Sequence, residues 1–369
     1  MNFTGTTASG FLSKGSRVLS LDVLRGLMAL VVVIYHIPQL SRAVGLPHFV
    51  DWPIFNRGTE AVKVFFTLSG YLIIGLLFDE KRNFGSINIY NFYIRRILRL
   101  YPVYYVVLIF GLVYYHFLLP FLGITYDANY KLLEAIVLNV VFLPNVFAVQ
   151  YEPGSILLIL WSIGIEEQFY LLIAPLLALL ASKRYAKVLL LFTLIYCFLF
   201  HSYSFPFLKQ YWFYYYYMSA GGFVAVMTKM GYHLSFNKFL NRLGIYLVFT
   251  VYFITDWLKF SNVLVNEGVA TVLFSVLIVN LVMDDIRENK YPFMRYLGKI
   301  SYGIYMYHMI VLNLVLFIGL KLQGMFNLSS LTSILFVNIT CLTGTILVSH
   351  FSYKYFESYF LILKLKFRK

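Results

Sequence analysis

Ten long apolar runs constrain this chain more than any other feature, because each is close to the length that a helix needs to cross a lipid bilayer. A transmembrane helix requires about 20 mainly apolar residues. The runs that meet this requirement are 19–40, 60–79, 100–122, 158–181, 186–205, 211–230, 243–260, 266–284, 300–320 and 331–353. We therefore predict an all-α fold: a polytopic integral membrane helical bundle of about ten transmembrane helices.

The composition agrees with a lipid environment. Hydrophobic residues occupy 60% of the 369 positions and charged residues only 12%, whereas a soluble domain has about 25% charged residues. A net charge of +14 is also found in nucleic-acid-binding proteins. Here, however, the basic residues lie in short loops between apolar runs, as the orientation of a membrane protein requires. We predict a single transmembrane domain over 1–369, surrounded by membrane lipid, with no nucleic-acid partner.

The charge of the loops sets the expected orientation. Basic residues concentrate near 81–99, 183–187, 229–242, 287–295 and at the C-terminus, and these segments alternate with loops that hold one basic residue each. Because Lys and Arg favour the cytoplasmic side, both termini are expected in the cytoplasm. The alternation allows one crossing between Lys131 and Lys183. The apolar piece 132–148, which Pro144 interrupts, is therefore expected to be re-entrant or to lie on the outer surface.

The first apolar run, LDVLRGLMALVVVIYHI, contains Arg25 and His36. Eleven helical steps separate them, about 16 Å along the axis, and place both side chains on nearly the same face. Charged groups at membrane depth usually face the bundle interior or a water-filled cavity. One interpretation is an arginine that reaches the membrane surface and a histidine that bonds a neighbouring helix. The other is a functional face.

Two further stretches carry polar residues at or near membrane depth. FFTLSGYLI holds Ser69 beside Gly70, a small pair typical of close helix packing. FYIRRILRLYP places Arg95, Arg96 and Arg99 at the cytoplasmic end of the third span. These arginines either set the membrane orientation or bind phosphate, since guanidinium groups and a helix N-terminus both favour anions.

Two more stretches lie in later spans. WSIGIEEQFYLLIAP carries Glu166 and Glu167 side by side, and packing alone explains two carboxylates there poorly, so we favour a functional or hydrogen-bonding role. ISYGIYMYHMIV contains Tyr302, Tyr305 and His308 on one broad side of the ninth span. Tyrosines near a membrane end commonly act as interfacial anchors, but the histidine has no such explanation.

Taken in order, these five stretches resemble the bacterial membrane-bound acyltransferase-3 family, which includes O-acetyltransferases of surface polysaccharides. The resemblance rests on Arg25 and His36 with ten residues between them, followed by FFTLSG, RRILRLYP, WSIGIEEQFY and ISYGIYMYH. It implies transfer of an acyl group, usually acetyl, from cytoplasmic acetyl-CoA to a hydroxyl of an extracytoplasmic or lipid-linked glycan. The expected location is the bacterial cytoplasmic (inner) membrane.

The resemblance also implies roles for single residues. Catalysis would fall on His36, Arg25 and Glu166, coenzyme binding on Arg95, Arg96, Arg99 and Ser69, and support of the substrate or structure on Glu167, Tyr302, Tyr305 and His308. Two positions depart from the family pattern: Thr67 stands where an aliphatic residue is usual, and no proline follows His308. We expect no metal, because His36 and His308 lack clustered carboxylate or thiolate partners in the sequence.

Some relatives carry a fused extracytoplasmic esterase-like domain. Because this chain ends soon after its last apolar run, such a partner is expected to be a separate extracytoplasmic transferase.

The chemistry of the residues leaves alternatives open. His36 could accept the proton of the attacking hydroxyl, or attack first and carry the acyl group as an acyl-imidazole. Arg25 could bind the coenzyme phosphates or the thioester oxyanion, and its position nearer the cytoplasm favours the phosphates. An alternative function is a transporter or exporter of a glycan or its lipid-linked unit, with the intramembrane charges along its path.

Overall fold

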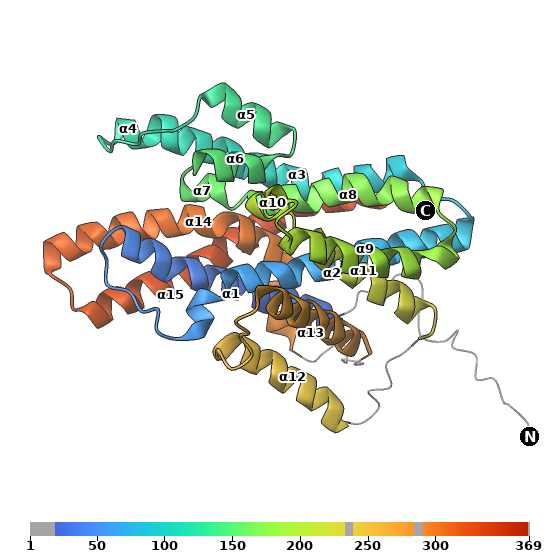
Figure 1. Ribbon diagram of the computed structural model, residues 1–369. Helices are drawn as coiled ribbons and strands as arrows, with labels where there is room; N and C mark the ends of the chain where they lie inside the picture. The colour runs from blue at the N-terminus through green and yellow to red at the C-terminus, as the bar shows by residue number, and fades with distance from the viewer. Residues whose placement is uncertain (1–18, 233–238, 284–290, 368–369) are drawn as a thin grey trace, which may run out of the picture.

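The computed structural model describes residues 19–232, 239–283 and 291–367. Every regular element in these ranges is a helix, and no strand occurs within them. The long helices lie roughly side by side, and α14 and α15 form a hairpin at one edge (Figure 1). The prediction of an all-α helical bundle is confirmed.

Each of the ten predicted spans overlaps a helix, although several boundaries differ. The helices are α1 (Leu19–Ala43), α2 (Gly58–Phe84), α3 (Ile89–Val113), α8 (Trp161–Leu179), α9 (Tyr185–His201), α11 (Tyr215–Lys229), α12 (Phe239–Ile254), α13 (Val263–Met283), α14 (Pro292–Phe326) and α15 (Ser330–Ser352). Residue 284, parts of the basic segments 229–242 and 287–295, and the last two residues lie outside the described ranges.

Short helical segments extend or connect these helices. They are η2 (Pro53–Asn56), η3 (Tyr114–Leu118), α4 (Leu119–Phe121), α5 (Leu132–Val140), α6 (Pro144–Tyr151), α7 (Ser155–Leu158), η4 (Ser182–Arg184), α10 (Pro206–Gln210), η5 (Tyr353–Glu357), α16 (Ser358–Leu363) and η6 (Lys364–Phe367). The nine-residue α5 and the eight-residue α6 rise about 12–14 Å each. Neither can cross a bilayer, as expected for the interrupted segment 132–148.

Eight helical segments of the described chain are long and apolar enough to cross a membrane. The helices α11 and α12 are shorter, with 15 and 16 residues, or about 22–24 Å against a hydrocarbon core of about 30 Å. The α11 helix packs between α2 and α9, so protein rather than lipid surrounds much of it. The chain is a multi-pass helical membrane protein.

Close helix contacts at glycines hold the centre of the bundle together. The α1 helix packs against both α2 and α14. A Cβ at Gly298 would overlap the backbone oxygen of Asp22, and one at Gly26 would lie 2.9 Å from the Gly298 nitrogen. A Cβ at Gly70 would likewise overlap the backbone of Met218. Only glycine allows these backbones to approach so closely, which confirms the packing expected at Ser69–Gly70.

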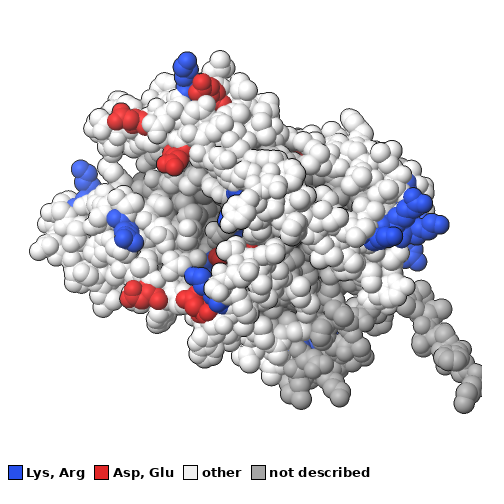
Figure 2. All heavy atoms as spheres, in the orientation of Figure 1, with Lys and Arg blue, Asp and Glu red and all other residues white. Residues whose placement is uncertain are grey.

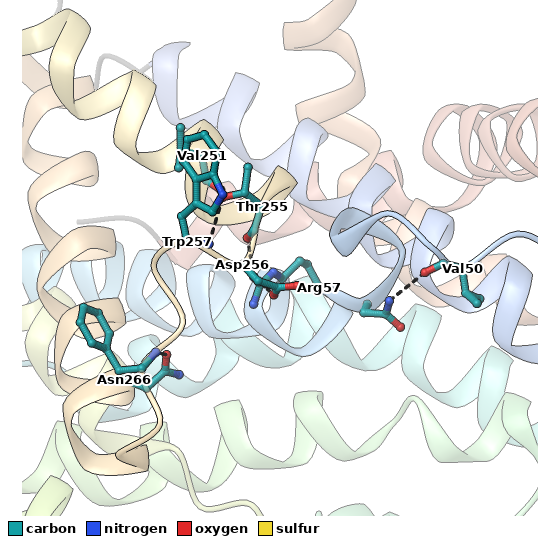
Figure 3. Close-up of polar contacts among 9 residues, drawn as sticks. Val50, Arg57, Val251, Thr255, Asp256, Trp257 and Asn266 are labelled. Carbon is teal, nitrogen blue, oxygen red and sulfur yellow. Dashed lines mark hydrogen bonds and ion pairs between the residues drawn. The ribbon is translucent and has the colours of Figure 1, made fainter.

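An ion pair ties the beginning of α2 to the end of α12. The Arg57 guanidinium donates to the Thr255 carbonyl at 2.8 Å and pairs with the Asp256 carboxylate at 2.9 Å (Figure 3). Arg57 also lies over the Tyr252 ring, 5.2 Å from its centroid. These contacts fix the chain that leads from α12 to α13.

Charge is distributed unevenly over the surface. A cluster of basic side chains lies at the right of Figure 2, at the end of the molecule where α2 ends and α9 begins in Figure 1. A broad uncharged belt separates this cluster from the charged groups on the opposite half. Such a belt between two charged ends is the surface expected of a membrane-spanning bundle.

Candidate functional site

Five helical regions meet around an internal cavity of about 70 Å³. Six of the residues singled out from the sequence line it: Arg25, Ser69, Arg99, Glu166, Tyr302 and Tyr305. They come from α1, α2, α3, α8 and α14. The fold therefore brings together five stretches that the sequence spreads from position 25 to position 305.

Hydroxyl groups hold the Glu166 carboxylate in place. The Ser69 hydroxyl donates to Oε1 of Glu166 at 2.5 Å, and the Tyr170 hydroxyl donates to the same oxygen. Two donors from different helices restrict the carboxylate to one orientation at the cavity wall. Tyr170 follows Glu166 by four residues, the spacing at which helical side chains meet.

The two cavity tyrosines bind neighbouring helices rather than the membrane surface. The Tyr302 hydroxyl donates to the Leu100 carbonyl of α3 at 2.7 Å. The Tyr305 hydroxyl lies 2.7 Å from the Ser162 hydroxyl and 3.1 Å from the Ile159 carbonyl. Interfacial anchoring does not describe either residue, since each hydroxyl has its partner inside the bundle.

His36 and His308 form a pair beside the cavity. Their ring centroids lie 5.2 Å apart, and the His308 ring lies 5.8 Å from that of Tyr305. His36 itself is not part of the cavity wall. It lies eleven positions after Arg25, about 16 Å further along α1.

The local hydrogen bond defines the tautomer of His308. Its Nδ1 lies 2.5 Å from the Tyr305 carbonyl oxygen. A carbonyl can only accept, so Nδ1 carries the hydrogen, and in the neutral ring Nε2 keeps a lone pair. His308 is completely buried, and within the described chain its Nε2 has no hydrogen-bond partner.

The three arginines expected to bind phosphate have different surroundings. Arg99 lines the cavity. Arg96 is buried, and its Nε has no hydrogen-bond partner among the described residues. Arg95 donates to the Phe367 carbonyl at 2.9 Å and pairs with Glu80 at 3.3 Å. Arg99 is the member of the three that meets the cavity directly.

The Glu167 side chain has different surroundings from those of the Glu166 side chain. It is only 4% exposed, does not line the cavity, and its Oε1 has no hydrogen-bond partner in the described part of the chain. Adjacent helical positions diverge by about 100°, which explains why the two carboxylates separate.

A buried ion pair between α2 and α13 was not singled out from the sequence. Lys63 Nζ lies 2.5 Å from Oε1 of Glu267, whose other oxygen accepts from Tyr216 at 2.7 Å and Tyr217 at 2.8 Å. The Lys63 ammonium also faces the Tyr214 ring, 5.4 Å from its centroid. A signal existed: both charges lie inside apolar runs of membrane length, where ionisable groups usually pair.

Comparison with known proteins identifies the family. A model of the acyltransferase-3 family, described as an acyltransferase domain, matches residues 18–350. The chain belongs to this family. The match covers all five stretches on which the resemblance rested, and it includes every helix that lines the cavity.

Three relatives of this acyltransferase-3 protein have partly matching chains. This chain is 36% identical over 154 residues to an uncharacterized protein of Haemophilus influenzae. The aligned segment covers 39% of this chain and 60% of the relative. It is 32% identical over 157 residues to the peptidoglycan O-acetyltransferase OatA of Listeria monocytogenes, covering 42% and 23%. It is 31% identical over 176 residues to a Staphylococcus aureus protein provisionally named an O-acetyltransferase, covering 45% and 26%.

The aligned segments therefore leave a large part of each relative unmatched, about three quarters for the relatives named as O-acetyltransferases. No solved structure matches the chain.

Proposed function

We propose that this protein transfers an acyl group, acetyl by default, from cytoplasmic acyl-CoA to a hydroxyl of a cell-surface or lipid-linked glycan. The proposed location is the bacterial cytoplasmic membrane. The observation that carries the proposal is the buried cavity where Arg25, Arg99 and Glu166 converge, with two histidines in contact beside it. The names of the two O-acetyltransferase relatives support it.

The acyl-CoA donor would bind at the part of the cavity formed by Arg25 and Arg99. Arg25 and Arg99 offer planar guanidinium groups suited to phosphates, and Arg25 stands in the half of α1 nearer the expected cytoplasmic end. The cavity of about 70 Å³ has room for about two waters, at about 30 Å³ each. A coenzyme arm is larger than this, so its binding would widen the cavity.

The reaction would form one ester bond and break one thioester bond. The acceptor oxygen attacks the thioester carbonyl carbon, the C–S bond breaks, and the hydroxyl proton ends on the coenzyme thiolate. His36 would take that proton as general base and pass it to the leaving sulfur. In the two-step route, His36 itself forms and then loses the bond to the acyl carbon. Both routes leave a glycan ester and free coenzyme A.

His308 would assist His36 by accepting a hydrogen bond at Nε2. The Tyr305 carbonyl fixes the hydrogen on Nδ1 of His308, so its Nε2 is free to accept from the His36 ring or from the acceptor hydroxyl. A histidine whose second nitrogen is held by a backbone carbonyl has a defined orientation and tautomer. Glu166, fixed by Ser69 and Tyr170, would position Arg25 and Arg99 electrostatically.

Acetyl esters on the purified surface glycans test the proposal. They are measured by NMR before and after mild alkali in wild type, in a deletion strain, and in the deletion strain carrying His36→Ala at matched membrane abundance. Coenzyme A binding to the purified protein is measured in parallel. We expect the esters to disappear from both mutant strains and the wild-type protein to bind coenzyme A. Glycans that keep their esters but fail to reach the surface would instead establish a transporter.

A further inference from the structure

A second, larger hollow opens near the end of α9. It has a volume of about 680 Å³ and is lined by the end of α9, by α10 and by the beginning of α13. Its wall includes Tyr203, Lys209, Gln210, Trp212 and Asn262. We call it the outer cleft. Its volume lies within the range of about 300–1,000 Å³ typical of small-molecule sites.

The outer cleft opens at the end of α9 opposite the basic residues that precede this helix. The α9 helix begins directly after Lys183 and Arg184 and ends at His201, which lines the cleft. Because such basic segments favour the cytoplasm, the cleft is expected to face the extracytoplasmic side. The cavity with Arg25 and Arg99, in contrast, lies within the bundle and nearer the cytoplasmic end.

The backbone around the cleft is suited to water rather than lipid. Between α9 and α11 the chain forms turns and the five-residue α10. Irregular backbone at membrane depth is tolerated where it is buried in protein or lines an aqueous cavity. Trp212 has φ 57°, a left-handed conformation that is unusual for a bulky side chain. Strained residues of this kind persist where the surroundings hold them and concentrate at functional sites.

The side chains of the cleft fit a carbohydrate. Trp212 and Tyr203 offer aromatic rings that can stack on the apolar face of a pyranose ring, while Asn262 offers an amide for its hydroxyls. None of the described residues that line the cleft is a carboxylate, and Lys209 supplies a positive charge. A neutral or anionic sugar is therefore favoured over a cation.

Aromatic contacts join the outer cleft to the inner cavity. The Trp212 ring in the cleft lies 5.1 Å from the Trp161 ring, and Trp161 lies 6.0 Å from Phe66. Phe66 lines the inner cavity, as does Ser162, the residue after Trp161. A ligand stacked on Trp212 would thus be separated from the inner cavity by the Trp161–Phe66 pair.

The buried ion pair supports the floor of the cleft. Phe200 in the cleft wall packs on the Tyr216 ring at 5.3 Å, and the Tyr216 hydroxyl donates to Glu267, the partner of Lys63. Lys63 and Glu267 neutralise each other behind this aromatic layer. The cleft floor is thereby linked to α2 and α13 through Tyr216 and the ion pair.

From these observations, and resting on the proposed acyl transfer, we infer that the outer cleft binds a sugar unit of the acceptor glycan on the extracytoplasmic side. Sugar stacking on Trp212 would hold the chain so that a hydroxyl reaches the histidine pair past Trp161. The donor and the acceptor would then approach the same reacting atoms from opposite ends of the bundle.

Chemical blocking of the cleft tests the inference. Gln210→Cys and Thr125→Cys are each introduced into a chain in which Cys197 and Cys341 are serine. Thr125 is the matched control, because it is exposed in the loop between α4 and α5 and does not line the cleft. Intact cells are treated with a bulky, membrane-impermeant thiol reagent. Acetyl esters on glycan made afterwards are compared with those of the untreated half of the same culture.

We expect treatment to lower the esters about tenfold or more in Gln210→Cys, because acceptor binding is lost, and to leave the Thr125→Cys strain unchanged. The labelled Gln210→Cys protein, once purified, should bind coenzyme A as its unlabelled form does. A labelled Gln210→Cys strain that keeps its esters, or a labelled protein that loses coenzyme A binding, overturns the inference. Failure of the proposed function itself is distinguishable, since untreated cells would then carry no esters that depend on this protein.

Discussion

The arginines of RRILRLYP show how side chains one helical turn apart can have different tasks. Arg99 faces the cavity, whereas Arg95, one turn earlier, is held by Glu80 and the Phe367 carbonyl. The sequence grouped both as coenzyme ligands. In the structure Arg95 links α3 to the C-terminal segment, whereas Arg99 is the one of the two that lines the cavity. Coenzyme binding by either arginine stays a prediction.

Arg99→Ala and Arg95→Ala form a matched pair that tests this distinction. We expect Arg99→Ala to weaken coenzyme A binding by about tenfold or more, since a charged hydrogen bond contributes about 1.5–3 kcal/mol. Arg95→Ala should leave the Kd near wild type and lower the apparent Tm, because the change removes an internal ion pair. Isothermal titration and thermal unfolding of the purified proteins measure both effects. The reverse pattern would reassign the phosphate contact to Arg95.

The Nε2 atom of His308 can be tested separately from the rest of the side chain. His308→Asn keeps an N–H that can donate to the Tyr305 carbonyl, but it removes the Nε2 lone pair. If Nε2 takes part in proton transfer, we expect acetyl transfer to fall by about 10²-fold or more, with abundance and Tm close to wild type. The measurement is the rate of ester formation at saturating acetyl-CoA. Near-normal activity in His308→Asn would limit the residue to a structural role.

At the scale of helices, glycines control how closely α1 approaches α14. Gly298 contacts the backbone at Asp22, three residues before the cavity residue Arg25. The crossing therefore sets the position of the Arg25 guanidinium relative to α14, which supplies Tyr302 and Tyr305. Packing of small residues here serves the geometry of the site as well as stability.

Gly298→Ala and Gly324→Ala compare the same change at two positions of α14. A Cβ at Gly298 would overlap backbone, whereas one at Gly324 meets nothing within 4 Å. We expect Gly298→Ala to destabilise the protein by about 1–3 kcal/mol, as overpacking does, and to weaken coenzyme A binding. Gly324→Ala should be neutral or stabilising by about 0.5–1 kcal/mol, since alanine favours the helix. Thermal unfolding in detergent measures both, and equal Tm values for the two variants would contradict this account.

At the scale of the whole molecule, basic residues and the outer cleft lie at opposite ends of α9. This arrangement would suit the proposed reaction between a cytoplasmic donor and an acceptor beyond the membrane. Two other helices carry several of the site residues. Arg25 and His36 lie on one face of α1, and α14 carries Tyr302 and Tyr305 at the cavity and His308 beside His36.

Cysteine labelling can establish the orientation directly. In a chain with Cys197→Ser and Cys341→Ser, we expect Lys183→Cys to resist an impermeant thiol reagent in intact cells and to react after permeabilisation. Thr125→Cys should react in both conditions, because its loop is at the opposite end. Both residues are exposed, so accessibility in the folded protein does not limit the comparison. Labelling of Lys183→Cys in intact cells would invert the proposed orientation.

The sequence by itself determined the elements of this protein and most of its candidate residues. Apolar length predicted ten helices, because a bilayer requires about 20 apolar residues per crossing. The high cost of charge in lipid drew attention to Arg25, His36 and Glu166 without any knowledge of their neighbours. Helical periodicity also placed Arg25 and His36 on one face, as the arrangement along α1 requires.

Only the tertiary structure decided which of these residues meet. A helical pattern defines a face and a depth, but it does not say which neighbouring helix that face contacts. For this reason the sequence could not separate Arg99 from Arg95, pair Lys63 with Glu267, or reveal the outer cleft. Those outcomes depend on packing, where glycine contacts such as that of Gly298 with Asp22 fix the distances between helices far apart in the sequence.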